Sequence, residues 1–127
     1  IPVTVIADLL GIPERNRHNL VPWSRGIIGW FEPERTREME LEAVRCAQEF
    51  MAYLKQLIPI KRQKPSDDLL CAMIAVHDTE PERLKEHELI NNCILLLNAG
   101  HEAVVNVIGN GMYALLRHKE QWENLKA

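Results

Sequence analysis

A carboxylate lies among small and apolar residues in the second half of the chain. Glu102 follows Ala99, Gly100 and His101, and Ala103 comes directly after it. The small side chains let a flat or bulky group approach the backbone closely. An acid in an apolar neighbourhood is suited to proton exchange, because desolvation disfavours its charged form. The pattern indicates proton transfer beside a bound group; the plainer alternative, which spacing alone favours, is a close helix crossing with Glu102 paired to a cation.

The same residues also begin a motif of zinc proteases, H-E-x-x-H. His101 and Glu102 supply its first two positions, but the second histidine would fall at Val105, which cannot bind zinc. The sequence therefore predicts no metal site of this kind.

These residues belong to a long predicted helix from Leu84 to His118. Apolar or small residues return to one side of it at helical spacing: Leu89, Cys93, Leu96, Leu97, Gly100, Val104, Val107, Gly111 and Leu115. We expect this helix to be the longest and most buried element of the chain. A local distortion is expected between Ala99 and Ala103, since glycine weakens a helix by about 1 kcal/mol relative to alanine. A membrane span is not favoured, because the uncharged run is short and contains asparagines.

The rest of the chain shows helical patterns and no strand pattern. Helices are predicted at Val3–Leu10, from Glu14 to a turn at 29–33, at Glu34–Leu57, and in a short segment capped by Ser66. Residues 59–65 form a basic stretch bounded by prolines, which we expect to be a loop. Thr79 and Glu82 have the spacing of a capping box, which predicts either the start of the long helix or a turn that leads into it. The predicted fold class is all-α, in a single helical segment that spans residues 1–127.

Composition and charge indicate which binding partners and which cellular compartment to expect. A chain of 127 residues that is 46% apolar and 26% charged suits one globular unit. Its formal net charge of -3 supplies no basic field, so we expect neither nucleic acid nor membrane as a partner. Cys46, Cys71 and Cys93 show no paired spacing, which is typical of a reducing compartment, and we expect a cytoplasmic protein. Since the chain opens on Ile1 and Pro2, we also expect it to be part of a longer protein.

Three stretches of the long helix resemble the central helix of the cytochrome P-450 superfamily, in its soluble bacterial form. They are residues 92–102, 106–111 and 115–118. The family motif is a small residue, Gly, any residue, an acid, and then Thr or Ser, and residues 99–102 fill the first four places. Ala103 occupies the fifth, where the family has an alcohol. Residues 2–13 are also similar to the family's sequence ahead of the substrate roof.

The resemblance implies a helical segment of the P-450 fold, built around one long central helix inside a larger haem-thiolate monooxygenase domain. It implies haem as the cofactor of the full-length parent, although no cysteine here lies in the glycine-rich loop that supplies the axial ligand. Glu102 would act in the proton relay, with Ala103 at the position of the usual alcohol. The implied haem-side residues are Leu95, Ala99, Gly100 and Ala103, and the implied substrate-side residues are Asn98, Trp30 and Phe31.

The parent is therefore expected to oxidise an apolar small-molecule substrate with electrons from a ferredoxin or a similar protein. The isolated chain is expected to be inactive and to self-associate through apolar surface that the missing parts would cover. The alternative is a non-catalytic helical module, or a decayed relative, that binds a partner. The absence of an alcohol at Ala103 keeps this alternative open.

Overall fold

Helices are the only regular elements in residues 1–126, the part of the chain that the computed structural model describes. In chain order they are α1 (Pro2–Leu9), the 3₁₀ helix η1 (Glu14–Asn19), α2 (Leu20–Ile28), the 3₁₀ helix η2 (Gly29–Phe31), α3 (Arg37–Gln63), α4 (Leu69–Thr79), α5 (Glu86–Arg117) and α6 (Lys119–Lys126). The predicted all-α fold class is confirmed. None of these helices combines the length and apolar character that a membrane crossing requires.

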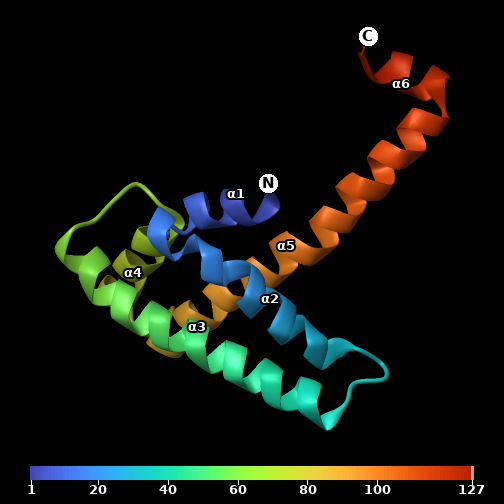
Figure 1. Ribbon diagram of the computed structural model, residues 1–127. Helices are drawn as coiled ribbons and strands as arrows, with labels where there is room; N and C mark the ends of the chain where they lie inside the picture. The colour runs from blue at the N-terminus through green and yellow to red at the C-terminus, as the bar shows by residue number, and fades with distance from the viewer. Residues whose placement is uncertain (127) are drawn as a thin grey trace.

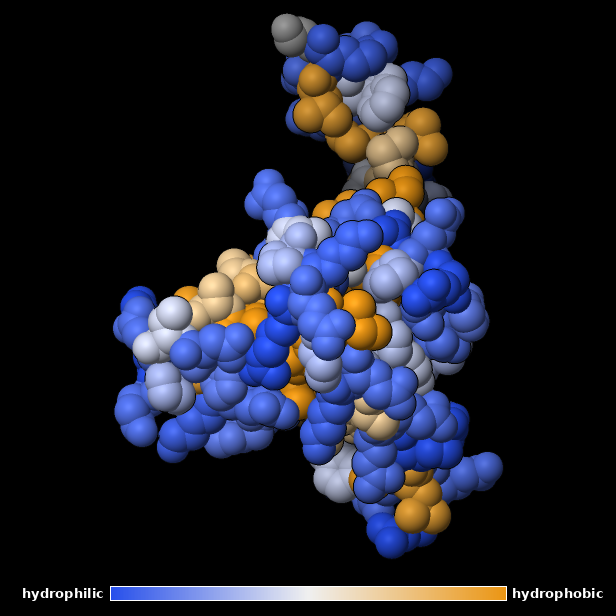
Figure 2. Space-filling model, turned by 90° about the vertical axis from the view of Figure 1, so that its left-hand side faces the viewer, coloured by the Kyte–Doolittle hydropathy of each residue, from blue (hydrophilic) through white to orange (hydrophobic). Residues whose placement is uncertain are grey.

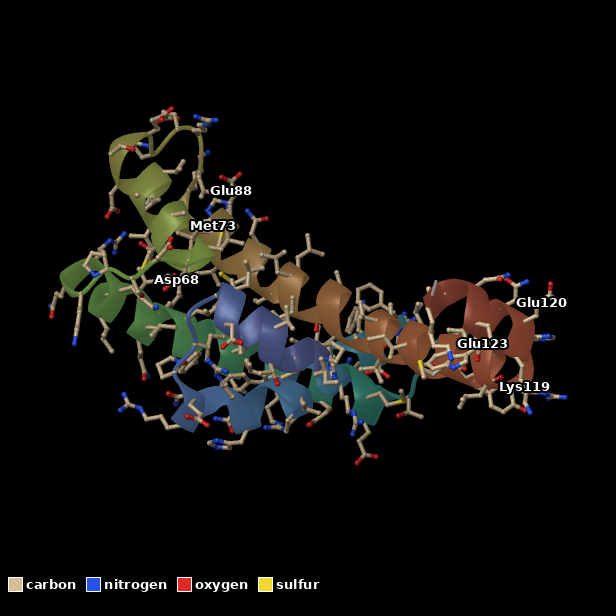
Figure 3. The ribbon with its side chains drawn as sticks, turned by 90° about the horizontal axis from the view of Figure 1, so that it is seen from above. Asp68, Met73, Glu88, Lys119, Glu120 and Glu123 are labelled. Carbon is tan, nitrogen blue, oxygen red and sulfur yellow. The ribbon has the colours of Figure 1, made fainter. Side chains whose placement is uncertain are left out.

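Helices α2 and α3 lie antiparallel and side by side, and α5 passes behind them (Figure 1). Helix α1 packs on α5, while α4 contacts both α3 and α5. Beyond this body, α5 continues alone toward α6 (Figure 1). Seen from above, Asp68 lies at one end of the molecule and Lys119, Glu120 and Glu123 lie at the other (Figure 3).

The core fills the space enclosed by α1, α2, α3, α4 and the first half of α5. Trp23 of α2 stacks on Phe50 of α3 with 5.1 Å between ring centroids, and its Nε1 donates a hydrogen bond to Glu49 Oε2 at 3.0 Å. Paired aromatic rings of this kind add to the burial of apolar area. The largest fully buried apolar side chains are Leu10, Ile12, Leu20, Phe50, Leu54, Ile58, Leu70, Leu89 and Leu97.

Helix α3 runs through Pro59 and ends at Gln63, so the predicted loop at residues 59–65 is wrong for its first five positions. Proline removes one backbone hydrogen bond and normally breaks a helix. Here two ion pairs fix the last turn against α4: Lys61 with Asp68, and Arg62 with Asp78 at 2.8 Å. Lys61 is buried, and a buried ammonium group requires such a partner. These tertiary contacts outweigh the local cost of the proline.

The start of α4 also differs from its prediction. Asp68, not Ser66, caps the helix, and its Oδ1 accepts a hydrogen bond from the Cys71 backbone N–H at 2.8 Å. The Ser66 hydroxyl instead donates to the Asp68 carboxylate. A carboxylate that already binds Lys61 is thereby held in the capping position as well.

The start of α5 is capped by residues other than the predicted pair. The backbone N–H of Lys85 donates to Glu88 Oε2 at 2.8 Å, as in a capping box. Thr79, by contrast, ends α4 and donates its hydroxyl to the Ala75 carbonyl at 2.8 Å. Thr79 and Glu82 therefore form no capping box, but residues 81–83 form a turn ahead of α5, which agrees with the second alternative.

The remaining boundaries shift by a few residues. The predicted second helix is divided into η1 and α2, which begins at Leu20, and α3 begins at Arg37 instead of Glu34. Gly11 follows α1 with a φ of +59°, and the N–H of Ile12 donates to the Ala7 carbonyl at 2.8 Å. Only glycine adopts this left-handed conformation at low cost, which explains the stop at this position.

Helix α5 is the longest helix, as predicted, but it is not the most buried one. Its buried residues are Leu89, Ile90, Cys93, Leu97 and His101, and burial stops there. Val107 is 70% exposed, and apolar side chains gather toward the end that carries α6 (Figure 2). The helix is continuous between Ala99 and Ala103, so the predicted distortion is absent.

Candidate functional site

Three of the residues predicted to line a cofactor share one face of α5. Leu95, Ala99 and Ala103 follow one another at intervals of four residues, which places them in one row on a helix. All three are exposed, and Leu95 is 63% exposed although it is a large apolar residue. The row is therefore a narrow apolar strip of mostly small side chains.

Gly100 lies on another side of α5. A Cβ atom at this position would collide with the side chain of Ile6 in α1. Gly100 therefore permits the close packing of α1 on α5, and the structure does not place it with the strip. A close helix crossing therefore accounts for the glycine at this position, and its role as a cofactor-binding residue stays a prediction.

Glu102 lies at the mouth of an open hollow of about 600 Å³ between α5 and α2. Arg25 of α2 lines the same hollow. The pairing of Glu102 with a cation stays a prediction. The other lining residues are Ile28, Gly29, Glu32, Pro33, Glu34 and Met39, from α2, η2, the following loop and α3.

A buried polar contact lies directly beside this hollow. His101 Nδ1 is 3.1 Å from Ser24 Oγ, and the two residues are 5% and 0% exposed. Burial lowers the pKa of His101; the Glu102 carboxylate opposes this effect and Arg25 reinforces it. The neutral imidazole is therefore favoured at pH 7. Sequence reasoning missed Ser24 and Arg25, although two polar residues between Trp23 and the apolar end of α2 were a usable signal.

The residues predicted to face substrate are not brought together. Asn98 is half-buried on α5, and its Oδ1 is enclosed without a hydrogen-bond partner among residues 1–126. Trp30 and Phe31 are exposed in η2 and line a separate apolar groove of about 280 Å³ between α2 and α3. The Arg35 guanidinium lies 5.5 Å from the centre of the Trp30 ring. No residue of α5 lines this groove.

The three cysteines lie away from the strip formed by Leu95, Ala99 and Ala103. Cys46 and Cys93 are buried; desolvation raises the pKa of both thiols, that of Cys93 to about 12. They therefore remain thiols at neutral pH, whereas iron binds the thiolate. Within the described part of the chain, no group of three or more His, Cys, Asp or Glu side chains is placed to hold a metal ion.

The exposed strip, the acid beside it and the all-helical fold agree with one family. The model of the cytochrome P-450 family matches residues 8–127. The chain belongs to the cytochrome P-450 family. The match extends over nearly all of the sequence, so it does not depend on the short motif at residues 99–103.

Bacterial P-450 proteins are similar along the whole chain. The monooxygenase PikC of Streptomyces venezuelae is 39% identical over 127 residues, which is 100% of this chain and 29% of PikC. The vitamin D(3) 25-hydroxylase of Pseudonocardia autotrophica is 39% identical over 121 residues, which is 95% of this chain and 28% of that protein. The chain thus spans less than a third of these P-450 relatives.

Solved P-450 structures confirm the fold. Mycobacterium smegmatis CYP164A2, with econazole bound, is 34% identical and has a TM-score of 0.87, with coverage of 98% of this chain and 32% of that one. CYP109E1 from Bacillus megaterium, in complex with testosterone, is 32% identical and has a TM-score of 0.83, with coverage of 98% and 33%. The chain is therefore a helical segment of the P-450 fold.

Proposed function

We propose that the parent of this segment is a haem-dependent monooxygenase that oxidises an apolar organic substrate. Membership of the P-450 family supports this activity, as do relatives named as a monooxygenase and a hydroxylase. The observation that carries the proposal is the exposed strip of Leu95, Ala99 and Ala103 with Glu102 beside it.

The strip fits a flat apolar group such as a haem. Leu95, Ala99 and Ala103 offer apolar contact along a straight stretch of helix, and the two alanines allow close approach. A haem bound on this strip would supply the iron chemistry of O₂ activation, and its iron would need a cysteine thiolate. The thiols of Cys46 and Cys93 are too buried for that role, so we expect the ligand from another part of the parent.

Glu102 is the proposed proton carrier. Oxygen activation consumes protons, and a positioned acid accelerates their transfer. Ala103 has no hydrogen-bonding group, so the side chain next to the acid cannot hold or pass a proton. We propose that a water held by Glu102 occupies the place of the missing hydroxyl. A hydroxyl group of the substrate is the second candidate, and Asn106, one turn further along α5, is the third.

Substrate and partner assignments follow from the same proposal. The testosterone complex and the vitamin D(3) hydroxylase support an apolar substrate. We propose that Asn98 meets it beside the strip and that Trp30 and Phe31 contribute from the η2 turn when the parent is complete. Electrons would come from a ferredoxin or a similar protein. The three free cysteines support a cytoplasmic location for the parent.

The variant Glu102→Gln in the full-length parent tests this function. Gln keeps the size of the side chain but cannot release a proton, so the rate of product formation should fall roughly 100-fold. Product formation per electron consumed is measured with a turnover assay. Ala103→Thr supplies a hydroxyl and should leave the rate similar or raise the fraction of electrons that reach product.

Normal turnover by Glu102→Gln would show that the proton relay does not pass through this acid. A parent that binds haem but makes no product with any apolar substrate would favour the decayed relative instead. The matched control is Glu88→Gln, which makes the same change at the other end of α5 and should not alter the rate.

A further inference from the structure

A hydrogen bond joins Ser24 of α2 to His101 of α5. On each helix, the next residue is a charged one that lines the hollow. Arg25 follows Ser24 on α2, and Glu102 follows His101 on α5. Both charged residues line the same hollow, while both members of the hydrogen-bonded pair are buried. The contact that joins the two helices therefore lies one residue away from each of the two charged groups that line the hollow.

We propose that Ser24 and His101 are a positioning pair that fixes Glu102 relative to Arg25. This inference rests on the proposed role of Glu102. Neighbouring residues of a helix are related by a fixed rotation and a rise of about 1.5 Å. A hydrogen bond that fixes the relative translation and rotation of α2 and α5 at Ser24 and His101 therefore also fixes the next residue on each helix.

The polar character of the pair supports this role. Two buried polar side chains cost free energy unless they bond to each other, whereas apolar side chains at the same positions would pack without directional preference. In residues 1–126 the Ser24–His101 bond is the only side-chain hydrogen bond between α2 and α5. Directional contact at this point selects one arrangement of the two helices.

Charge near the pair is consistent with the same role. The charged side chains that act on His101 are Glu102 on its own helix and Arg25 on α2. Burial lowers the pKa of His101, so its imidazole stays neutral. Arg25 is then the cation that lines the hollow with Glu102, and the neutral His101 adds no second positive charge.

The other side of α2 is also fixed. A Cβ atom at Gly26 would collide with the Cys46 side chain of α3, so α2 packs closely on α3 at this level. Helix α2 is thus held by α3 on one side and by the His101 contact on the other. Loss of the Ser24 hydroxyl would release only the contact on the side of Glu102.

The test uses the full-length parent with haem bound. Ser24→Ala removes the hydroxyl. Product formation per electron should then fall roughly 10- to 100-fold, because a small misplacement of a group near a reacting centre has effects of this size. Ser24→Thr keeps the hydroxyl and should restore most of the activity. Thermal unfolding of each variant measures its stability. The matched control is His77→Gln, because His77 Nδ1 also joins two segments through a contact with the Leu84 carbonyl at 2.9 Å.

A double-mutant cycle separates positioning from general stability. If Ser24 acts through Glu102, then Ser24→Ala should change the rate by less than about twofold when Glu102→Gln is already present. The inference would be overturned if the losses of rate multiplied in the double variant. It would also be overturned if Ser24→Ala and His77→Gln lost equal amounts of activity, or if Ser24→Ala lost none. Failure of the proposed function looks different, since Glu102→Gln alone would then turn over normally.

Discussion

The two halves of α5 have similar apolar content but different surroundings. From Leu89 to His101 the helix is enclosed by α1, α2, α3 and α4, and its inward side chains are buried. The second half projects from the body toward α6 (Figure 1). Its exposed apolar residues include Val107, Ile108 and Leu116. The sequence pattern that identifies an inward face is present in both halves, but α1, α2, α3 and α4 cover only the first half, and within residues 1–126 the second half leads into α6.

This difference shows that periodicity predicts which side of a helix can be buried, not whether it is. An apolar face becomes a core only where other elements cover it. The covering helix α2 also brings Ser24 into contact with His101 and places Arg25 in the hollow that Glu102 lines. The candidate site therefore lies at the boundary between the enclosed and the projecting half.

The largest expected effect comes from truncating a buried side chain in the enclosed half. Leu97→Ala should lower the free energy of unfolding of the 127-residue chain by about 2–5 kcal/mol, because Leu97 is fully buried and its loss leaves a cavity. Leu116→Ala, at a residue that is 64% exposed, should change it by less than about 0.5 kcal/mol. Urea unfolding measures both. Equal costs would mean that the projecting half is covered as well.

An intermediate effect is expected from a charge placed on the projecting half. We predict that the isolated chain self-associates through its exposed apolar residues, and that Val107→Glu weakens the association at least about tenfold, or 1.4 kcal/mol. Equilibrium ultracentrifugation measures the dissociation constant. Gln121→Glu adds the same charge on α6 and is the control. A chain that remains monomeric at high concentration would contradict the prediction.

The smallest effect is expected from the glycines of α5. Gly109→Ala should stabilise the chain by about 0.5–1 kcal/mol, because nothing lies near the added methyl group and alanine favours the helix. Gly100→Ala should gain less or lose stability, since Ile6 must move to make room. Thermal unfolding of the two variants compares the halves directly. A larger gain at Gly100 than at Gly109 would mean that α1 does not pack there.

Local patterns predicted the helices well and their partners poorly. The spacing of Leu89, Cys93 and Leu97 is sufficient to identify the enclosed half of α5, and the stripe on α3 is equally regular. The continuation of α3 through Pro59 could not be predicted, because it depends on ion pairs with residues of α4.

The site was predicted in part for the same reason. Glu102, Ala99 and Ala103 are recognisable because they are close in sequence, and their roles remain predictions. The contribution of Ser24 and Arg25 depends on how α2 lies on α5, which no local pattern contains. The separation of Gly100 from the strip likewise became clear only from the position of Ile6.

The Ser24–His101 contact joins residues that are 77 positions apart. Closing a flexible loop of that length costs about 4 kcal/mol of chain entropy, whereas a hydrogen bond contributes only about 0.5–1.5 kcal/mol net. The pair therefore cannot draw α2 and α5 together by itself. The hydrogen bond can fix the relative position of α2 and α5 only after α3 and α4 have packed and shortened the effective loop. We therefore expect this contact to form late in folding.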